Sequence, residues 1–141
     1  MERVSKSFDQ LSNMELYDIL KARVNIFVVE QKCPYPEVDG ADPGAQHLFI
    51  RDSGRILAYA RIVDEGGSTA RIGRVITTVR GQGYGRDIME FSLKWIRENK
   101  DAKRVILEAQ IYAIGFYEKF GFRVVSEEFW DDGIEHVWME L

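Results

Sequence analysis

Apolar side chains recur at intervals of three and four residues along the first part of the chain, at Leu16, Ile19, Leu20, Val24, Phe27 and Val28. That spacing places them on one face of a helix and predicts that this face packs against a core. Ser12 followed by Glu15 has the form of a capping box, so we expect the helix to begin there. Pro34 ends any regular continuation.

A pattern typical of strands follows, over three runs that cover residues 47–51, 55–63 and 69–76. Asp-Ser-Gly and Glu-Gly-Gly-Ser segments separate the runs and are typical of turns between neighbouring strands. We therefore expect an antiparallel meander. Both alternating sets of side chains in the middle run are largely apolar, which favours a sheet covered by a helix on each face.

The second half of the chain switches between helical and extended patterns. Apolar residues from 88 to 96 predict a helix that ends around Asn99, and residues 113–120 predict a short helix stopped by Gly121. Short apolar runs at 105–107, 124–125 and 134–139 predict strands. Because a strand, a glycine loop, a helix and another strand follow one another, we expect a parallel pair within a mixed sheet that has helices on both sides.

The composition is that of an ordinary globular protein, with 45% apolar and 30% charged residues. A length of 141 residues suits one domain, which we expect to cover residues 1–141 and to act alone or as a homodimer. The formal charge of −4 is spread among residues of both signs, which argues against nucleic acid as a partner. No run suits a membrane span or a signal peptide, so we expect a cytoplasmic protein without a membrane partner.

Cys33 is the single cysteine, which excludes an internal disulfide and a thiolate zinc cluster. It could be a nucleophile or a reduced thiol, and the lack of a histidine nearby in the sequence favours the thiol. His47, His136, Asp39 and Asp42 lack the close spacing of metal ligands, so we expect no metal.

Three glycines, Gly81, Gly83 and Gly85, occupy alternate positions just before the predicted helix of residues 88–96. Without side chains, the backbone N–H groups of such a turn can converge on one anion, and the helix dipole favours the same charge. Arg80 and Arg86 flank the loop and suit bidentate contact with phosphate. The spacing departs from the motifs that bind NAD or ATP, and the alternative is a glycine-rich helix entry without a ligand.

Arg80-x-x-Gly83-x-Gly85 resembles the (Gln/Arg)-x-x-Gly-x-(Gly/Ala) signature of the GNAT superfamily of CoA-dependent N-acyltransferases. The segment 116–122, Phe-Tyr-Glu-Lys-Phe-Gly-Phe, resembles the second recurrent block of that family. Residues 27–35, Phe-Val-Val-Glu-Gln-Lys-Cys-Pro-Tyr, are similar to its ElaA-like branch. The resemblance spans nearly the whole chain. It implies an α/β fold (α+β in some schemes) with a mixed, mostly antiparallel sheet of six to seven strands and helices on both faces.

The resemblance also implies acyl-CoA, most simply acetyl-CoA, as co-substrate, without a metal. Its pyrophosphate would contact Arg80, Gly81, Gln82, Gly83, Tyr84, Gly85 and Arg86. The pantetheine and thioester would meet backbone groups of Arg74, Val75 and Ile76, where a bulge would free an N–H for the developing oxyanion. Gln110 stands where relatives often carry an Asn that binds CoA. Tyr117 matches the general acid of many members, and its alternative role is aromatic packing.

An ammonium substrate must lose a proton before it attacks the thioester, so the reaction needs a general base. Residue chemistry alone leaves the identity of this base open. The candidates are Glu30, Asp39, His47 and Glu108, of which we favour Glu30 or His47, and His136 ranks below them. The activity implied is direct acyl transfer to a primary amine of a small molecule, a peptide or a protein.

Two other functions stay open at this point. The first is a CoA-binding sensor or interaction module without turnover. The second is an enzyme similar to acyl-homoserine-lactone synthases, which Arg23-x-x-x-Phe27 faintly resembles and which use S-adenosylmethionine. The turn-rich loop 34–46 is either functional or a passive surface loop. Its carboxylates, together with Glu30, could attract a cationic amine or could simply be solvated.

Overall fold

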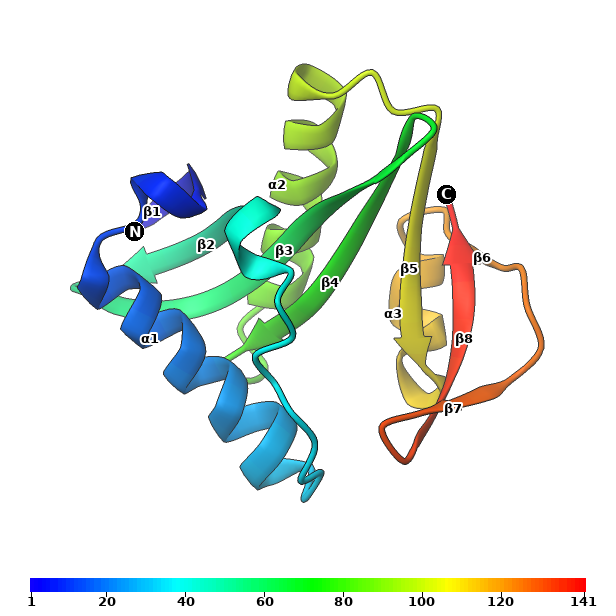
Figure 1. Cartoon of the computed structure of the whole chain (residues 1–141), viewed down its shortest axis with the longest axis horizontal. Helices are drawn as coiled ribbons and strands as arrows, with labels where there is room; N and C mark the ends of the chain where they lie inside the picture. Colours follow the sequence, from blue (N-terminus) through cyan, green and yellow to red (C-terminus); the bar gives the residue numbers. More distant parts are fainter.

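The fold is a single eight-stranded sheet with helices on both faces, described for residues 1–141 by a computed structural model (Figure 1). The strands lie in the order β1-β2-β3-β4-β5-β8-β6, and β7 pairs with β8. All pairs are antiparallel except β4 with β5. The predicted fold class and its parallel pair are therefore confirmed.

The elements before the glycine loop match the predicted meander and helix. They are β1 (Glu2–Ser7), a 3-10 turn (Phe8–Gln10), α1 (Asn13–Arg23), a π-helical segment η2 (Val24–Glu30), a 3-10 turn (Asp42–Gly44), β2 (Gln46–Asp52), β3 (Arg55–Gly66) and β4 (Thr69–Thr77). The capping box is present, because the Ser12 hydroxyl accepts from the Glu15 amide at 3.0 Å and the Glu15 carboxylate accepts from the Ser12 amide at 2.8 Å.

The later elements are α2 (Tyr84–Asn99), β5 (Arg104–Gln110), a 3-10 turn (Ile111–Ala113), α3 (Ile114–Glu118), β6 (Arg123–Val124), β7 (Phe129–Asp131) and β8 (Ile134–Glu140). The predicted count of six to seven strands falls short of the eight observed, and no predicted run covers β1 or β7. The clearer omission is β7. This strand has only three residues, and its central Trp130 is 70% exposed, so no apolar run marks it. Gly121, at φ +97°, ends the helical region as expected.

Two apolar clusters cover the two faces of the sheet. On one face Ile88, Met89, Leu93 and Ile96 of α2 pack with alternate residues of β2 to β5 and β8. On the other face Ile19 of α1 packs with Phe49, Ile56, Tyr59 and Ile76. Residues 56–62 of β3 are all buried, as expected for a strand that has a helix on each side. No helix combines the length and apolarity needed to cross a membrane.

The parallel pair of β4 and β5 forms only at the beginning of each strand. Their register joins Thr69 to Arg104, Ala70 to Val105 and Arg71 to Ile106, and no residue further along either strand is paired with the other. Figure 1 shows the two strands diverging from that point. The sheet therefore opens in its middle, directly before the glycine loop.

Candidate active site

A cleft lies where β4 and β5 diverge. Its lining comes mainly from η2, the following segment 31–37, both diverging strands, the 3-10 turn before α3, Tyr117 of α3, and the hairpin of β7 and β8. Among the predicted site residues, Arg74, Val75, Gln110 and Tyr117 line it. Segments that are distant in sequence thus meet at one site.

A β-bulge in β4 forms part of the cleft wall. Arg61 of β3 pairs with Gly73 and Tyr59 with Ile76, so one residue of β3 faces both Arg74 and Val75. Arg74 has φ +54°, in the left-handed region that a side chain rarely adopts. Because a bulge leaves its extra residue outside the ladder, backbone groups of this segment can point into the cleft, as the resemblance implies.

The glycine loop leads from β4 into the 16-residue helix α2. Gly81 has φ +74°, and Gly83, the N-cap of α2, has φ +78°. A Cβ built at either position meets nothing within 4 Å, whereas at Gly85 it would lie 3.4 Å from the Phe116 ring. The loop is therefore open on its outer side, with the N-terminal N–H groups of a long helix behind it.

The arginines that flank this loop are on the surface and form ion pairs. Arg80 donates to Glu30 at 3.0 Å, and Arg86 donates to Glu90 at 2.9 Å within α2. Both pairs are largely exposed and so contribute little to stability. Glu30, one of the two favoured bases, thus lies beside the glycine loop and outside the residues that line the cleft.

Tyr117 of α3 reaches the cleft from the other side of the sheet. Its side chain is buried, with ring contacts to Phe116 at 5.1 Å and Phe122 at 6.3 Å between centroids. It therefore packs in the core and also lines the cleft, so both predicted roles are compatible. Burial, followed by the nearby Tyr112 phenol, raises the pKa of Tyr117 and keeps its hydroxyl protonated.

Glu108 lines the cleft from β5, one of the two diverging strands. Burial, and then the neighbouring carboxyl of Asp131, raise its pKa to about 7, although Arg71 and Arg74 act in the opposite direction. A carboxyl with this pKa can accept a proton near neutral pH. Sequence reasoning ranked Glu108 below Glu30 and His47 because the contact with Asp131 depends on β7, which the pattern did not predict.

His47 is buried and is not among the residues that line the cleft, so it is not placed to act as a base on a substrate bound there. Its ring is fully buried, with Nδ1 2.6 Å from the Tyr59 hydroxyl and Nε2 2.9 Å from the Asp42 carbonyl. Both nitrogens are occupied, and burial lowers its pKa. His136 lines the cleft from β8, and its Nδ1 lies 2.8 Å from the Ile134 carbonyl.

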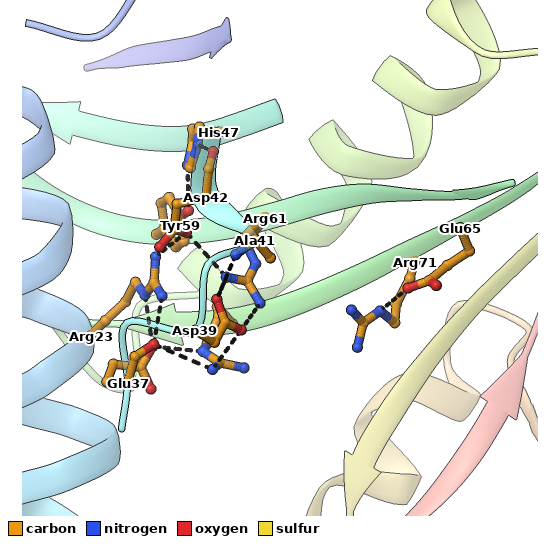
Figure 2. Close-up of polar contacts among 11 residues, drawn as sticks. Arg23, Glu37, Asp39, Ala41, Asp42, His47, Tyr59, Arg61, Glu65 and Arg71 are labelled. Carbon is orange, nitrogen blue, oxygen red and sulfur yellow. Dashed lines mark hydrogen bonds and ion pairs between the residues drawn. The ribbon is translucent and has the colours of Figure 1, made fainter. Parts of the chain in front are cut away.

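Loop 34–46 carries a network of buried ion pairs, which Figure 2 shows. Asp42 accepts from Arg23 at 2.6 Å and from Arg61 at 3.1 Å, and Asp39 holds Arg61 through two contacts of 2.8 and 2.9 Å. Glu37 accepts from Arg23 at 2.8 Å. The loop carboxylates are therefore paired with arginines, Glu37 and Asp42 are buried while Asp39 stays partly exposed, and the loop is anchored to α1 and to the sheet.

The sequence did carry one signal for this network, because Arg61 stands in a strand whose neighbours are apolar. Its side chain is 2% exposed and that of Arg23 is 0% exposed. An arginine in such a position requires carboxylate partners, since burying an unpaired charge is costly. Of the motif Arg23-x-x-x-Phe27, Arg23 is buried in this network and does not line the cleft, whereas Phe27 does.

The segment after η2 crosses the mouth of the cleft. The amides of Gln31 and Gln110 form two hydrogen bonds, of 3.4 and 3.2 Å, and the Cys33 thiol donates to the Asp132 carbonyl at 2.8 Å. Burial, with the nearby carboxylates of Asp132 and Asp131, raises the pKa of Cys33. A protonated thiol in this position links the two sides and is a poor nucleophile.

These features can be compared with known proteins. Residues 18–141 match the family of acetyltransferase (GNAT) domains. The chain belongs to the GNAT family. A UPF0039 protein of Schizosaccharomyces pombe is 43% identical over 145 residues, which cover 100% of this chain and 97% of that protein.

Two solved structures place the chain within the family more closely. The crystal structure of ElaA from Escherichia coli is 35% identical, with a TM-score of 0.93 and 99% of each chain covered. An acyl-CoA N-acyltransferase from Pseudomonas aeruginosa is 37% identical, also with a TM-score of 0.93, and 99% of this chain and 97% of that chain are covered. The resemblance of this GNAT protein to the ElaA-like branch is thereby confirmed.

Proposed function

We propose that this GNAT protein transfers an acyl group, most simply acetyl, from acyl-CoA to a primary amine by direct attack within a ternary complex. The observation that carries the proposal is the convergence of a strand bulge, a buried tyrosine and a carboxyl of raised pKa at one cleft, with an open glycine loop following the strand that carries the bulge. Bringing both reactants together there supplies much of the rate enhancement.

The residues present fit coenzyme A. The open glycine loop with α2 behind it suits a pyrophosphate, and Arg80 and Arg86 lie beside it with exposed side chains that can turn to phosphate oxygens. The unpaired edges of β4 and β5 offer backbone groups to the amide-bearing pantetheine arm. Gln110 would contribute only by giving up its hydrogen bonds with Gln31.

Glu108 is the residue that we propose as proton acceptor for the amine. An alkyl ammonium has a pKa near 10, so a base that is ionised at neutral pH must take its proton directly or through water. Glu108 lines the cleft and has a pKa of about 7, whereas Glu30 is exposed and paired with Arg80. This assignment replaces the two bases that the sequence favoured.

Two further groups act on the thioester that the co-substrate supplies. A backbone N–H at the bulge around Arg74 and Val75 can stabilise negative charge on the carbonyl oxygen, an effect that typically contributes about 10²-fold or more. The Tyr117 hydroxyl, protonated because it is buried, can give a proton to the departing thiolate.

The charges of the cleft favour an amine as acceptor. Arg61 and Arg74 are neutralised by loop carboxylates, and Arg71 pairs with Glu65. Glu108, Asp131 and Asp132 line the same cleft, and no basic side chain lies within ion-pair distance of them. An ammonium group is therefore attracted to the point where the proposed base lies. We place this reaction in the cytoplasm.

The proposal is tested in two steps with the purified chain. A thermal shift with acetyl-CoA at a hundredfold excess over its dissociation constant should correspond to about 2.7 kcal/mol of added stability. Release of free thiol is then followed with a panel of primary amines, with matched alcohols as controls. Binding without thiol release from any amine would indicate a CoA-binding sensor, and no binding would refute both functions.

A further inference from the structure

One carboxylate oxygen joins the end of the first helix to the bulge of β4. Glu37 Oε2 accepts from Arg23 Nε at 2.8 Å and from Arg74 Nε at 2.6 Å. The Glu37 carbonyl oxygen also accepts from both guanidinium groups, at 3.2 and 3.5 Å. Its side chain is only 8% exposed, so water competes little for these contacts.

The residue held in this way has an unusual backbone. Arg74 adopts φ +54°, a conformation that is unfavourable for any residue that carries a Cβ and persists only where the surroundings enforce it. Three contacts hold its side chain, namely Glu37, Asp39 at 3.2 Å, and the Phe27 ring at 5.9 Å from the guanidinium carbon. Of the two carboxylates, Glu37 makes the shorter contact and is the more buried.

The charges of the network balance, so each carboxylate is needed to keep the network neutral. Three guanidinium groups, of Arg23, Arg61 and Arg74, face three carboxylates, of Glu37, Asp39 and Asp42. Asp42 contacts Arg23 and Arg61 but makes no contact with Arg74, whereas Glu37 contacts Arg23 and Arg74. Removal of either carboxylate therefore perturbs the same network, but of these two only Glu37 contacts Arg74, so only its removal weakens the hold on the bulge directly, with Asp39 still in contact.

We propose that Glu37 is a positioning residue of the active site, which holds Arg74 in its left-handed conformation and so aims the bulge N–H at the reacting carbonyl. The proposal rests on the proposed function for its catalytic consequence. It gives loop 34–46 a role in the chemistry without contact with the reacting atoms. Misplacement of a catalytic group by about 1 Å can cost about 10²-fold in rate, so a small relaxation of the bulge is sufficient.

The test compares Glu37→Gln with Asp42→Asn, which makes the same chemical change in the same network. With acetyl-CoA and an accepted amine, Glu37→Gln should lower kcat at least about tenfold and leave the dissociation constant of acetyl-CoA within about threefold. Asp42→Asn should lower Tm at least as far but keep kcat within about twofold. Equal losses of kcat in the two folded variants, or an unchanged kcat in Glu37→Gln, would overturn the proposal.

A second measurement does not depend on turnover. In NMR spectra of the full chain, Glu37→Gln should shift the amide resonances of Arg74 and Val75 and speed their hydrogen exchange, and Asp42→Asn should leave both near their wild-type values. Unchanged bulge amides in Glu37→Gln would refute the positioning role. If the wild-type chain transfers no acyl group, the kinetic measurement refutes the proposed function, and the amide measurement still decides whether Glu37 holds the bulge.

Discussion

Replacement of Arg23 by methionine should be among the most destabilising single changes in the chain. The Arg23 side chain is 0% exposed and donates to Glu37 and Asp42, both buried, so the variant leaves the three carboxylates of the network with two guanidinium groups. Removing one partner of a buried pair costs about 3–5 kcal/mol. With an unfolding entropy of about 0.3 kcal/mol per kelvin for 141 residues, Tm should fall by about 10–17 °C.

The stability lost in Arg23→Met should also depend on pH. This dependence distinguishes a loss of charge pairing from a loss of packing. Although burial alone raises the pKa of Asp42, its hydrogen bonds and ion pairs with Arg23 and Arg61 lower it overall, so this stabilisation is present above about pH 4 and is lost as the pH falls through the native pKa. In the Arg23→Met variant a carboxyl of the network can take up a proton in mild acid. The difference in free energy of unfolding between variant and wild type should therefore be smaller at pH 5 than at pH 7.

Urea unfolding at several pH values measures this difference, and Arg97→Met, at an exposed arginine of α2, is the matched control. The free energy of unfolding of this control should stay within about 0.5 kcal/mol of the wild-type value. The argument from buried charge would be refuted if Arg23→Met lowered the free energy of unfolding by less than about 1 kcal/mol, or by the same amount at pH 5 and pH 7.

Three further predictions concern the cleft and the glycine loop. Tyr117→Phe should lower kcat by about 10²-fold in thiol-release assays with little change in KM for acetyl-CoA, and an unchanged kcat would rule out the acid role. The wild-type kcat/KM should fall as the pH drops below about 7, where Glu108 becomes protonated, and this limb should be absent in Glu108→Gln and move to lower pH in Asp131→Asn. Gly83→Ala, at φ +78°, should lower Tm through about 1–2 kcal/mol of strain and reduce the thermal shift given by acetyl-CoA, unlike Gly115→Ala at an unstrained glycine.

Local patterns predicted those parts of the fold that depend on neighbouring residues. The capping box at Ser12 and Glu15, the meander from β2 to β4 and the amphipathic helix α2 all follow from spacings of a few residues. β7 was missed because it is short and because Trp130 points outwards, so its place depends on its pairing with β8. Local spacing carries no information on such pairings.

The candidate site likewise has a part that local sequence motifs identify and a part that depends on contacts between distant residues. The glycine loop, Tyr117 and the strand residues around Arg74 lie in motifs that are contiguous in sequence, so the resemblance could identify them, and their roles remain predictions. The contact of Glu108 with Asp131 and that of Glu37 with Arg74 join residues 23 and 37 positions apart. Ranking bases by chemical type therefore favoured His47, whose burial and occupied nitrogens are tertiary properties.

The short register between β4 and β5 has a consequence for the motion of the molecule. Within the sheet, the portion from β1 to β4 and the portion of β5, β8, β6 and β7 are joined through only three residue pairs. The contacts of Gln31 with Gln110 and of Cys33 with Asp132 connect the two portions at the other end of the gap. The apolar core packed against α2 also spans both portions on one face of the sheet. A thioester bound along the two unpaired strand edges would limit local opening there, so hydrogen exchange of the backbone amides in the second half of β5 should slow when the ligand binds.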